Sequence, residues 1–243
     1  MDKIEVEPGL FLTSDYCVWY KPKDIIILAD IHMGYESGLK EEGFSLPLFQ
    51  KDEVLDKIST IKDKYDPNTF IIAGDFKHDF GRSEKREFSD ILDTMDYILQ
   101  DCDLTIVRGN HDNYLQNLTD YKGIPFYEES IKIDELFITH GHIDLDYEGV
   151  LIIGHEHPSL KIRDEIGAII KRPCFLHSKR NGIIVLPAFS PMAEGRDIVN
   201  TDQFFSDILS DIDDIKDFDI YALSEDGIIH FQTIEKIRKA YHM

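Results

Sequence analysis

The sequence has few cysteines, few basic residues and no long hydrophobic run, and each shortage excludes a class of protein. Because no stretch of about 18 apolar residues occurs, no membrane-spanning helix is predicted. The N-terminal stretch MDKIEVEPGL lacks the apolar core of a secretory signal. The three cysteines, Cys17, Cys102 and Cys174, form no CxxC pair, which favours reduced thiols over a disulfide framework. We therefore expect a cytoplasmic protein that does not associate with membranes.

The shortage of basic residues limits the partners. The 26 Lys and Arg residues face 47 Asp and Glu residues, which gives a net charge of −21. Such a surface repels polyanions, so tight binding to long duplex DNA is not expected, whereas a nucleotide-sized substrate is easier to accept. A local basic patch or a metal site could still hold a nucleic acid. Candidate phosphate contacts, with surface salt bridges as the alternative for each, are Lys77, Arg82, Arg108, Arg172, Lys179, Arg180 and Arg196.

Part of the negative charge is concentrated in one segment, TDQFFSDILSDIDDIKDFD at 201–219. A calcium loop is one interpretation, but the segment lacks the central glycine and the terminal glutamate of an EF-hand. A solvated acidic helix face or loop is therefore the preferred interpretation.

What the sequence does contain is a repeated local pattern. Short, apolar, β-branched runs end in loops that carry His, Asp or Asn; they lie at 24–30, 69–75, 104–110, 136–142 and 150–158. Near-continuous apolar runs of this kind indicate strands buried on both faces. Amphipathic helices are predicted at 50–64 and 83–100, the second with Ser83 as N-cap and Glu87 near the capping-box position. The alternation of strands and helices indicates crossover units of an α/β fold.

The second half of the chain is richer in strands. A strand is predicted at 182–189, where Pro187 marks its end. A hairpin is predicted at 219–234, with its turn at Asp226–Gly227. We interpret this half as a second sheet packed on the first, within one domain of residues 1–243. The last residues, 235–243, are expected to form a short helix or a frayed tail.

Metal-competent side chains follow all five apolar runs. Ligands of α/β sheets gather beyond the carboxyl ends of strands, and a convergence of so many polar groups is costly unless a cation pairs with them. Mixed His, Asp and Asn donors suit Mn²⁺, Fe²⁺, Zn²⁺, Co²⁺ or Ni²⁺. There are too many donors for one ion, so the sequence predicts two divalent ions. The donors are Asp30, His32, Asp75, His78, Asn110, His111, Asp112, His140, His142, His155 and His157.

The order of these residues resembles the calcineurin-like metallophosphoesterases. The blocks of that family stand here as DIH at 30–32, GD at 74–75, GNHD at 109–112, HGH at 140–142 and GHEH at 154–157. The resemblance implies a four-layer α/β/β/α sandwich of two mixed sheets. It also implies two divalent ions, most often Mn²⁺, and a bridging hydroxide that attacks phosphorus.

The resemblance assigns a role to each position. Asp75 is expected to bridge the two ions. Asp30, His32 and His157 would bind the first ion, and Asn110, His140 and His155 the second. His111 would stabilise the phosphoryl charge and donate a proton to the leaving oxygen. Asp112 either caps the turn that follows it or takes part directly, with neither preferred.

Two histidines and one aspartate are less clearly assigned. His78 stands in a GDxxH block, where phosphoprotein phosphatases have GDxxD, and this resembles the nuclease branch of the superfamily. There the corresponding histidine pairs with the histidine of GNH; the alternative is a solvent-facing loop histidine. His142 is more readily a structural neighbour of the ligands than a ligand. Asp79 is expected at the surface.

Beyond the motifs, GHEHPSLKIRDEIG, KRPCFL and LPAFSPMAEG look like the archaeal phosphoesterases related to the DNA-ligase-associated group, a match that extends to about residue 196. The function expected is a phosphodiesterase acting on nucleotides or short nucleic-acid ends, with a possible link to DNA repair or ligation and a homodimer plausible. The alternatives are a repair nuclease, a phosphomonoesterase and, least favoured, a non-catalytic scaffold.

Overall fold

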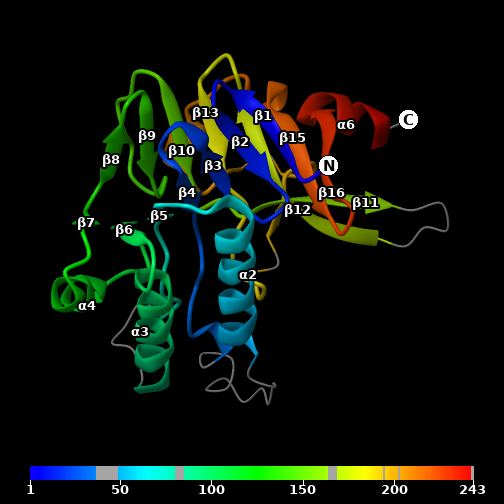
Figure 1. Cartoon of the computed structure of the whole chain (residues 1–243). Helices are drawn as coiled ribbons and strands as arrows, with labels where there is room; N and C mark the ends of the chain where they lie inside the picture. Colours follow the sequence, from blue (N-terminus) through cyan, green and yellow to red (C-terminus); the bar gives the residue numbers. More distant parts are fainter. Residues whose placement is uncertain (37–48, 80–84, 164–168, 194, 202, 242–243) are drawn as a thin grey trace.

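The computed structural model describes residues 1–36, 49–79, 85–163, 169–193, 195–201 and 203–241. In this part of the chain two mixed sheets pack face to face, and helices cover their outer faces (Figure 1). The helices are α2 (Gln50–Tyr65), α3 (Lys85–Leu99), α4 (Leu115–Lys122), α5 (Asp207–Ser210) and α6 (Ile234–Tyr241). Short 3-10 turns occupy Lys21–Lys23 and Ile215–Asp217. The α/β sandwich predicted from the sequence is confirmed.

The first sheet has the strand order β1-β2-β3-β4-β5-β6-β7. Its first four strands pair antiparallel, and β4 through β7 pair parallel. The strands are β1 (Lys3–Glu7), β2 (Leu10–Thr13), β3 (Val18–Tyr20), β4 (Ile25–Leu28), β5 (Thr69–Ala73), β6 (Asp103–Val107) and β7 (Phe126–Tyr127).

The second sheet has the order β14-β11-β12-β13-β10-β9-β8, and β15 and β16 extend it from β12. Strands β9, β10 and β13 are parallel neighbours, so their carboxyl ends share one edge. The strands are β8 (Ser130–Ile133), β9 (Leu136–Thr139), β10 (Val150–Ile153), β11 (Pro158–Arg163), β12 (Ile169–Ser178), β13 (Ile183–Val185), β14 (Arg196–Asp197), β15 (Asp219–Ser224) and β16 (Gly227–Thr233).

Three hydrophobic cores separate the layers. In β4, alternate side chains pack in two different cores. Ile26 and Leu28 belong to the core under α2 and α3, whereas Ile25 and Ile27 belong to the core between the two sheets. The third core lies on the far side of the second sheet, where α5, α6 and the chain around residues 198–218 cover it. Burial on both faces explains why these strands are apolar at successive positions.

Most predicted elements are confirmed, with bounds that differ by a few residues. The helix predicted at 50–64 is α2, which buries Val54, Ile58 and Ile61 on one face and ends at Asp66 in a left-handed conformation. The helix predicted at 83–100 begins at Lys85, so the proposed cap Ser83 lies outside the described residues. The predicted hairpin is β15 and β16, and the C-terminal residues form α6.

Two expectations need correction. The strand predicted at 182–189 ends at Val185, two residues before Pro187, because the chain then leaves the ladder towards the site. The N-terminal strands β1–β3 were not predicted at all. The acidic segment 201–219 is partly helical, and its apolar side chains other than Phe205 pack on the third core while many of its carboxylates face outward.

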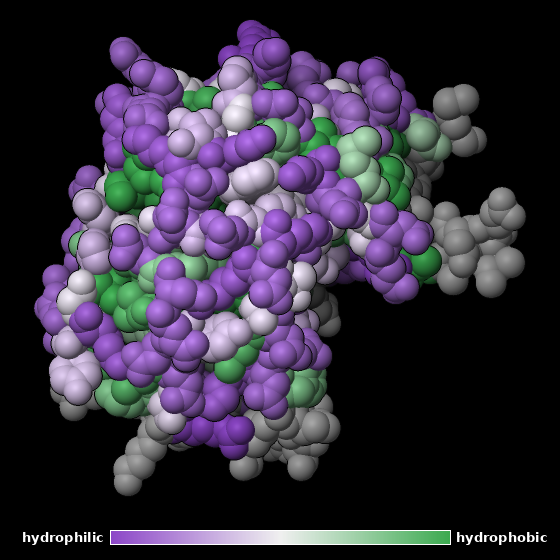
Figure 2. All heavy atoms as spheres, viewed as in Figure 1, coloured by the Kyte–Doolittle hydropathy of each residue, from purple (hydrophilic) through white to green (hydrophobic). Residues whose placement is uncertain are grey.

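The molecular surface agrees with the composition. The face seen in Figure 2 is mostly hydrophilic, and its hydrophobic residues form small groups separated by hydrophilic ones. Among the described helices, none has both the length and the apolar composition needed to cross a membrane.

Candidate metal centre

The five predicted loops meet where the two sheets face each other. They follow β4, β5 and β6 of the first sheet and β9 and β10 of the second. Backbone hydrogen bonds tie neighbouring loops: the Asp30 amide donates to Gly74 O at 3.0 Å, and the His32 amide donates to Asp75 O at 2.9 Å. The His155 amide donates to Asp30 Oδ2 at 3.0 Å, which links the two sheets directly.

The predicted ligands form two adjacent groups, each with ligand atoms within 4.8 Å of one another: Asp30, His32 and His157, and Asp75, His140 and His155. In the first group, His157 Nε2 lies 3.1 Å from Asp30 Oδ1. In the second, His140 Nε2 lies 3.3 Å from Asp75 Oδ2. Asn110 adjoins the second group, because its Oδ1 lies 3.0 Å from His140 Nε2.

Asp75 lies between the two groups. Its Oδ2 is 3.3 Å from His140 Nε2 and 3.7 Å from His32 Nε2. Its Oδ1 accepts a hydrogen bond from the His111 amide at 2.9 Å, which fixes the orientation of the carboxylate. One oxygen is therefore held by the backbone, and the other points at both sets of donors.

His140 shows how the chain orients a predicted ligand. Its Nδ1 donates to the carbonyl of Ala73 at 3.0 Å, so Nε2 is the nitrogen that faces the other donors. The side chain is fully buried. Gly74 makes room for it, because a Cβ at that position would lie 2.4 Å from the imidazole.

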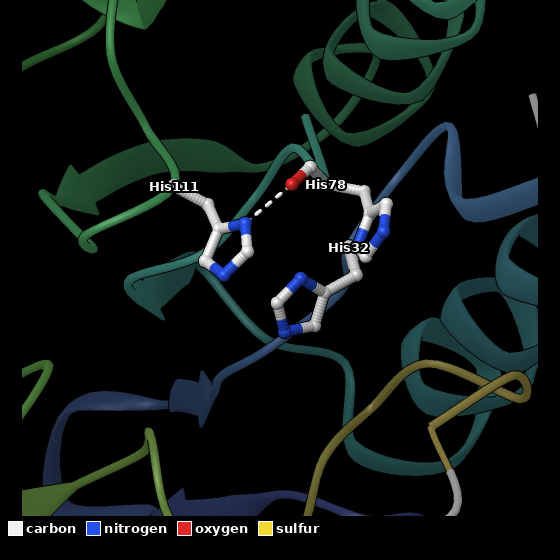
Figure 3. A group of neighbouring side chains, drawn as sticks. All are labelled: His32, His78 and His111. Carbon is white, nitrogen blue, oxygen red and sulfur yellow. Dashed lines mark hydrogen bonds between the residues drawn. The ribbon is translucent and has the colours of Figure 1, made fainter. Parts of the chain in front are cut away.

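His111 and His78 lie beside the first group. The rings of His32, His78 and His111 come together, and the nitrogens of this trio also lie within 4.8 Å of one another (Figure 3). His111 Nδ1 donates to the backbone carbonyl of His78, so Nε2 faces Asp75 Oδ2 at 3.9 Å. The link that the sequence analysis expected between the two imidazoles is thus made through a main-chain oxygen, and the rings stack with centroids 5.6 Å apart.

The other uncertain residues have structural contacts. Asp112 is buried, and its carboxylate accepts from the Gly109 amide at 2.8 Å and the Lys77 amide at 3.2 Å, so it ties its own loop to the loop after β5. The His142 ring packs 5.2 Å from that of His140 but joins neither group of donors. Asp79 is exposed.

The basic candidates are mostly engaged elsewhere. Lys77 is buried and donates to the carbonyl of Asp79. Arg108 pairs with Glu128 at 2.7 Å, and Arg180 pairs with Asp214. Arg82 lies outside the described residues. Arg196 lies closer to the site, because its backbone amide donates to the carbonyl oxygen of His157, a predicted ligand, at 2.7 Å.

The buried carboxylates of the site are stabilised by nearby positive charge. Burial raises the pKa of Asp75, but the imidazoles of His140, His32 and His111 together outweigh this effect and lower it overall. Burial lowers the pKa of His140, but the carboxylates of Asp75 and Asp30 outweigh that and raise it to about 9. Burial, with a smaller contribution from His140, lowers the pKa of His155 to about 4. A proton on His140 therefore balances carboxylates that a cation would otherwise neutralise.

The donor set fits divalent ions. Asp30 Oδ1 is buried and accepts no hydrogen bond within the described part of the chain. Imidazole, carboxylate and carboxamide donors suit borderline divalent metals. Asp30, His32 and His157 would hold one ion, Asn110, His140 and His155 the other, and Asp75 would contact both.

Some residues that support the site escaped the sequence analysis. Gln50 is buried at the start of α2, and its Nε2 donates to His32 O at 2.7 Å. A polar residue in register with the apolar face of the predicted helix was the available signal. Glu156, between two predicted ligands in the sequence, is also buried and accepts from the Ser206 amide at 2.6 Å.

A family model and one solved structure agree with this fold. The model of the family described as calcineurin-like phosphoesterase matches residues 23–221. The crystal structure of Pseudomonas putida nuclease MPE is similar with a TM-score of 0.67 at 19% identity, over 91% of this chain and 96% of that one. YfcE, a phosphoesterase from E. coli, aligns with a TM-score of 0.41 at 14% identity, over 84% and 90% of the two chains. The search of curated proteins gives no match. Since the family model spans most of the chain and its motif residues converge at one site, the protein belongs to the calcineurin-like phosphoesterase family.

Proposed function

We propose that the protein is a binuclear metal-dependent phosphodiesterase that hydrolyses nucleotides or short nucleic-acid ends, with Mn²⁺ as the favoured metal. The observation that carries this proposal is the position of Asp75, whose Oδ2 faces both His32 and His140 at 3.7 and 3.3 Å. Two ions held this way would polarise the phosphoryl oxygens and acidify a water molecule.

The chain itself supplies orientation and a proton. The bond from His111 Nδ1 to the His78 carbonyl fixes the ring and leaves Nε2 towards the donors. From that position Nε2 would carry the proton for the leaving oxygen. His78 would act by holding His111, through its carbonyl and its stacked ring.

The preference for diesters rests on analogy. The GDxxH block resembles the nuclease branch, and the Pseudomonas putida relative is itself named a nuclease. A phosphomonoesterase remains the nearest alternative, because the same metals serve both reactions. A substrate panel of monoester, linear diester, cyclic nucleotide and single-stranded DNA separates them.

The decisive experiment measures hydrolysis of an aryl phosphodiester with Mn²⁺. Asp75→Asn should lose turnover together with bound metal, as measured by elemental analysis. His111→Ala should keep its metal and lose about 10²–10⁴-fold in kcat. His230→Ala, a partly exposed histidine on β16, is the matched control and should behave as wild type. Wild-type turnover in both site variants would overturn the proposal.

The remaining expectations accompany this function as proposals. A cytoplasmic setting suits three cysteines that are all buried and unpaired. A role beside DNA repair or ligation, and a homodimer, follow from the family resemblance. Gel filtration with light scattering tests the homodimer.

A further inference from the structure

The acidic segment places one exposed aromatic ring at the edge of the metal centre. Phe205 is 62% exposed, and its ring centroid lies 6.1 Å from that of His155 in an edge-to-face arrangement. Its neighbours are anchored: Phe204 packs on the third core, and Ser206 is fully buried. The ring is therefore presented outward by a fixed stretch of backbone.

A cation lies against this ring. The guanidinium carbon of Arg196 is 4.1 Å from the Phe205 centroid. Arg196 is held in turn by the Glu156 carboxylate, with Nη1 3.8 Å from Oε2, and by Nη2 donating to Thr201 Oγ1 at 3.3 Å. The guanidinium covers part of the ring and leaves the rest to solvent.

The same contacts connect the Phe205 ring to the loop that carries His155 and His157. Glu156 stands between the proposed ligands His155 and His157, and its Oε1 accepts from the Ser206 amide at 2.6 Å. The buried carboxylate thus fixes both Arg196 and the backbone next to Phe205. The position of the ring relative to the second group of donors is set by the fold.

We propose that Phe205, supported by Arg196, is a stacking platform for the nucleobase of a substrate whose phosphate occupies the metal centre. The inference rests on the proposed function and specifies its substrate class. Aromatic stacking suits a nucleobase because every base has a π-face, so the platform would favour nucleotides without reading their sequence. It also explains how an acidic protein holds a nucleotide: the affinity comes from the base and the metals rather than from a basic groove.

The test compares two diesters that differ only in their bases: a dinucleoside monophosphate and its abasic analogue, two deoxyriboses joined by the same phosphate. Phe205→Leu should raise KM for the dinucleotide about tenfold with little change in kcat, because one stacked base is lost. KM for the abasic diester should not change, and Phe205→Trp should restore the wild-type value. Tyr121→Leu, at a 79% exposed aromatic of α4, is the matched control.

A binding measurement keeps the two proposals separable. Calorimetry of nucleoside monophosphate and of deoxyribose phosphate with the Mn²⁺-loaded protein should show a loss in Phe205→Leu for the nucleotide alone. If the wild-type protein hydrolyses neither diester, the proposed function is wrong. The difference in affinity between the nucleotide and deoxyribose phosphate still tests whether Phe205 stacks on the base. Equal effects on both ligands, or none on either, would overturn the platform. Unchanged nucleotide affinity with lost self-association would assign Phe205 to a protein contact instead.

Discussion

At the residue scale, five of the seven proposed ligands share an uncommon backbone conformation. Asp30, His32, Asp75, His155 and His157 have φ values between 45° and 69°, in the left-handed region. That region costs a non-glycine residue about 1–2 kcal/mol. Five such residues in the loops after β4, β5 and β10 indicate that these loops are shaped for the position of their side chains, and strain concentrated in this way is typical of functional sites.

Gly74 provides a test of how tightly these loops are packed. In Gly74→Ala the new Cβ would lie 2.4 Å from the buried ring of His140, and φ is +84°. We expect a loss of about 2–4 kcal/mol in the free energy of unfolding, since overpacking adds to backbone strain, and weaker Mn²⁺ binding. Chemical denaturation and metal titration measure the two effects.

Gly123→Ala is the matched control for that variant. Gly123 also has a left-handed φ, +70°, but a Cβ there meets no atom within 4 Å. It should lose only about 1 kcal/mol of stability through backbone strain and keep its metal affinity. Equal losses in the two alanine variants would show that strain alone, and not the packing of His140, controls the site.

Individual residues also show which parts of the site could be predicted from the sequence. Asp30, Asp75 and His140 could be predicted as a cluster because their types and their positions after apolar runs were visible in the chain. The contact of His78 could not, since it uses a carbonyl oxygen that every residue carries. Phe205 was equally hidden, because its place depends on the long-range contacts of Glu156 with Ser206 and Arg196.

At the scale of elements, helix α2 supports the site from behind the first sheet. Gln50 holds the His32 carbonyl, and Lys57 Nζ donates to Phe189 O at 3.0 Å. The same segment is tied to the ligand loop, because the Ser190 amide donates to Asp30 O at 3.0 Å. Side chains on one face of α2 therefore restrain two segments next to the proposed ligand Asp30. One is the loop that follows it, at His32, and the other is the segment at Phe189 whose neighbour Ser190 binds the Asp30 carbonyl.

Lys57 gives this support a pH dependence. Burial lowers its pKa to about 8, although Glu53 partly opposes the shift, so between about pH 8 and the unfolded value near 10.5 the unfolded chain binds more protons. Stability from this group therefore rises with pH across that window. Relative to Lys57→Met, wild type should gain about 1–3 kcal/mol between pH 7.5 and 9.5.

The measurement is urea unfolding of both proteins across that pH range. Other groups, such as Tyr65 with its raised pKa, titrate in both proteins and cancel in the difference. A difference that stays constant with pH would mean that Lys57 keeps an ordinary pKa in the folded state.

Strands could be predicted from the sequence where a single hydrophobic pattern dominated the segment. The parallel strands β4, β5 and β6 read as apolar runs because cores lie on both of their faces. Strands β1 to β3 are short and antiparallel, and β1 is only partly buried, so their signal was limited to alternation at Ile4 and Val6 and a turn at Pro8–Gly9. Their pairing with β4 is a tertiary contact that local sequence does not state.

At the scale of the whole molecule, the buried carboxylates couple metal binding to stability. Asp30 and Asp75 are at most 2% exposed, and each belongs to one of the two groups of donors. An ion that binds only the folded state at 100 times its Kd adds about 2.7 kcal/mol. For a chain of this size we expect Mn²⁺ to raise Tm by roughly 5–10 °C, and EDTA to reverse the rise.

Scanning calorimetry with and without Mn²⁺ checks this expectation. Asp75→Asn should show a much smaller shift, because the side chain between the two groups of donors loses its charge. His230→Ala should show the full shift, since it lies outside the donor groups. The same shift in all three proteins would place the stabilising ion elsewhere.

The net charge of −21 separates the proposed phosphodiesterase from a repair nuclease. A nuclease with about 6–10 phosphate contacts loses about 10³–10⁵-fold in affinity between 50 and 200 mM salt. Here Arg108 and Arg180 are paired with carboxylates, and Lys77 is buried, so these cations offer little to a long strand. Salt would instead screen the repulsion between the acidic surface and the substrate.

We expect KM for a 20-nucleotide single strand to stay within about threefold between 50 and 200 mM salt and not to fall below KM for a dinucleotide. Steady-state kinetics at both salt concentrations decides, because a steep rise in KM for the long strand would favour the nuclease.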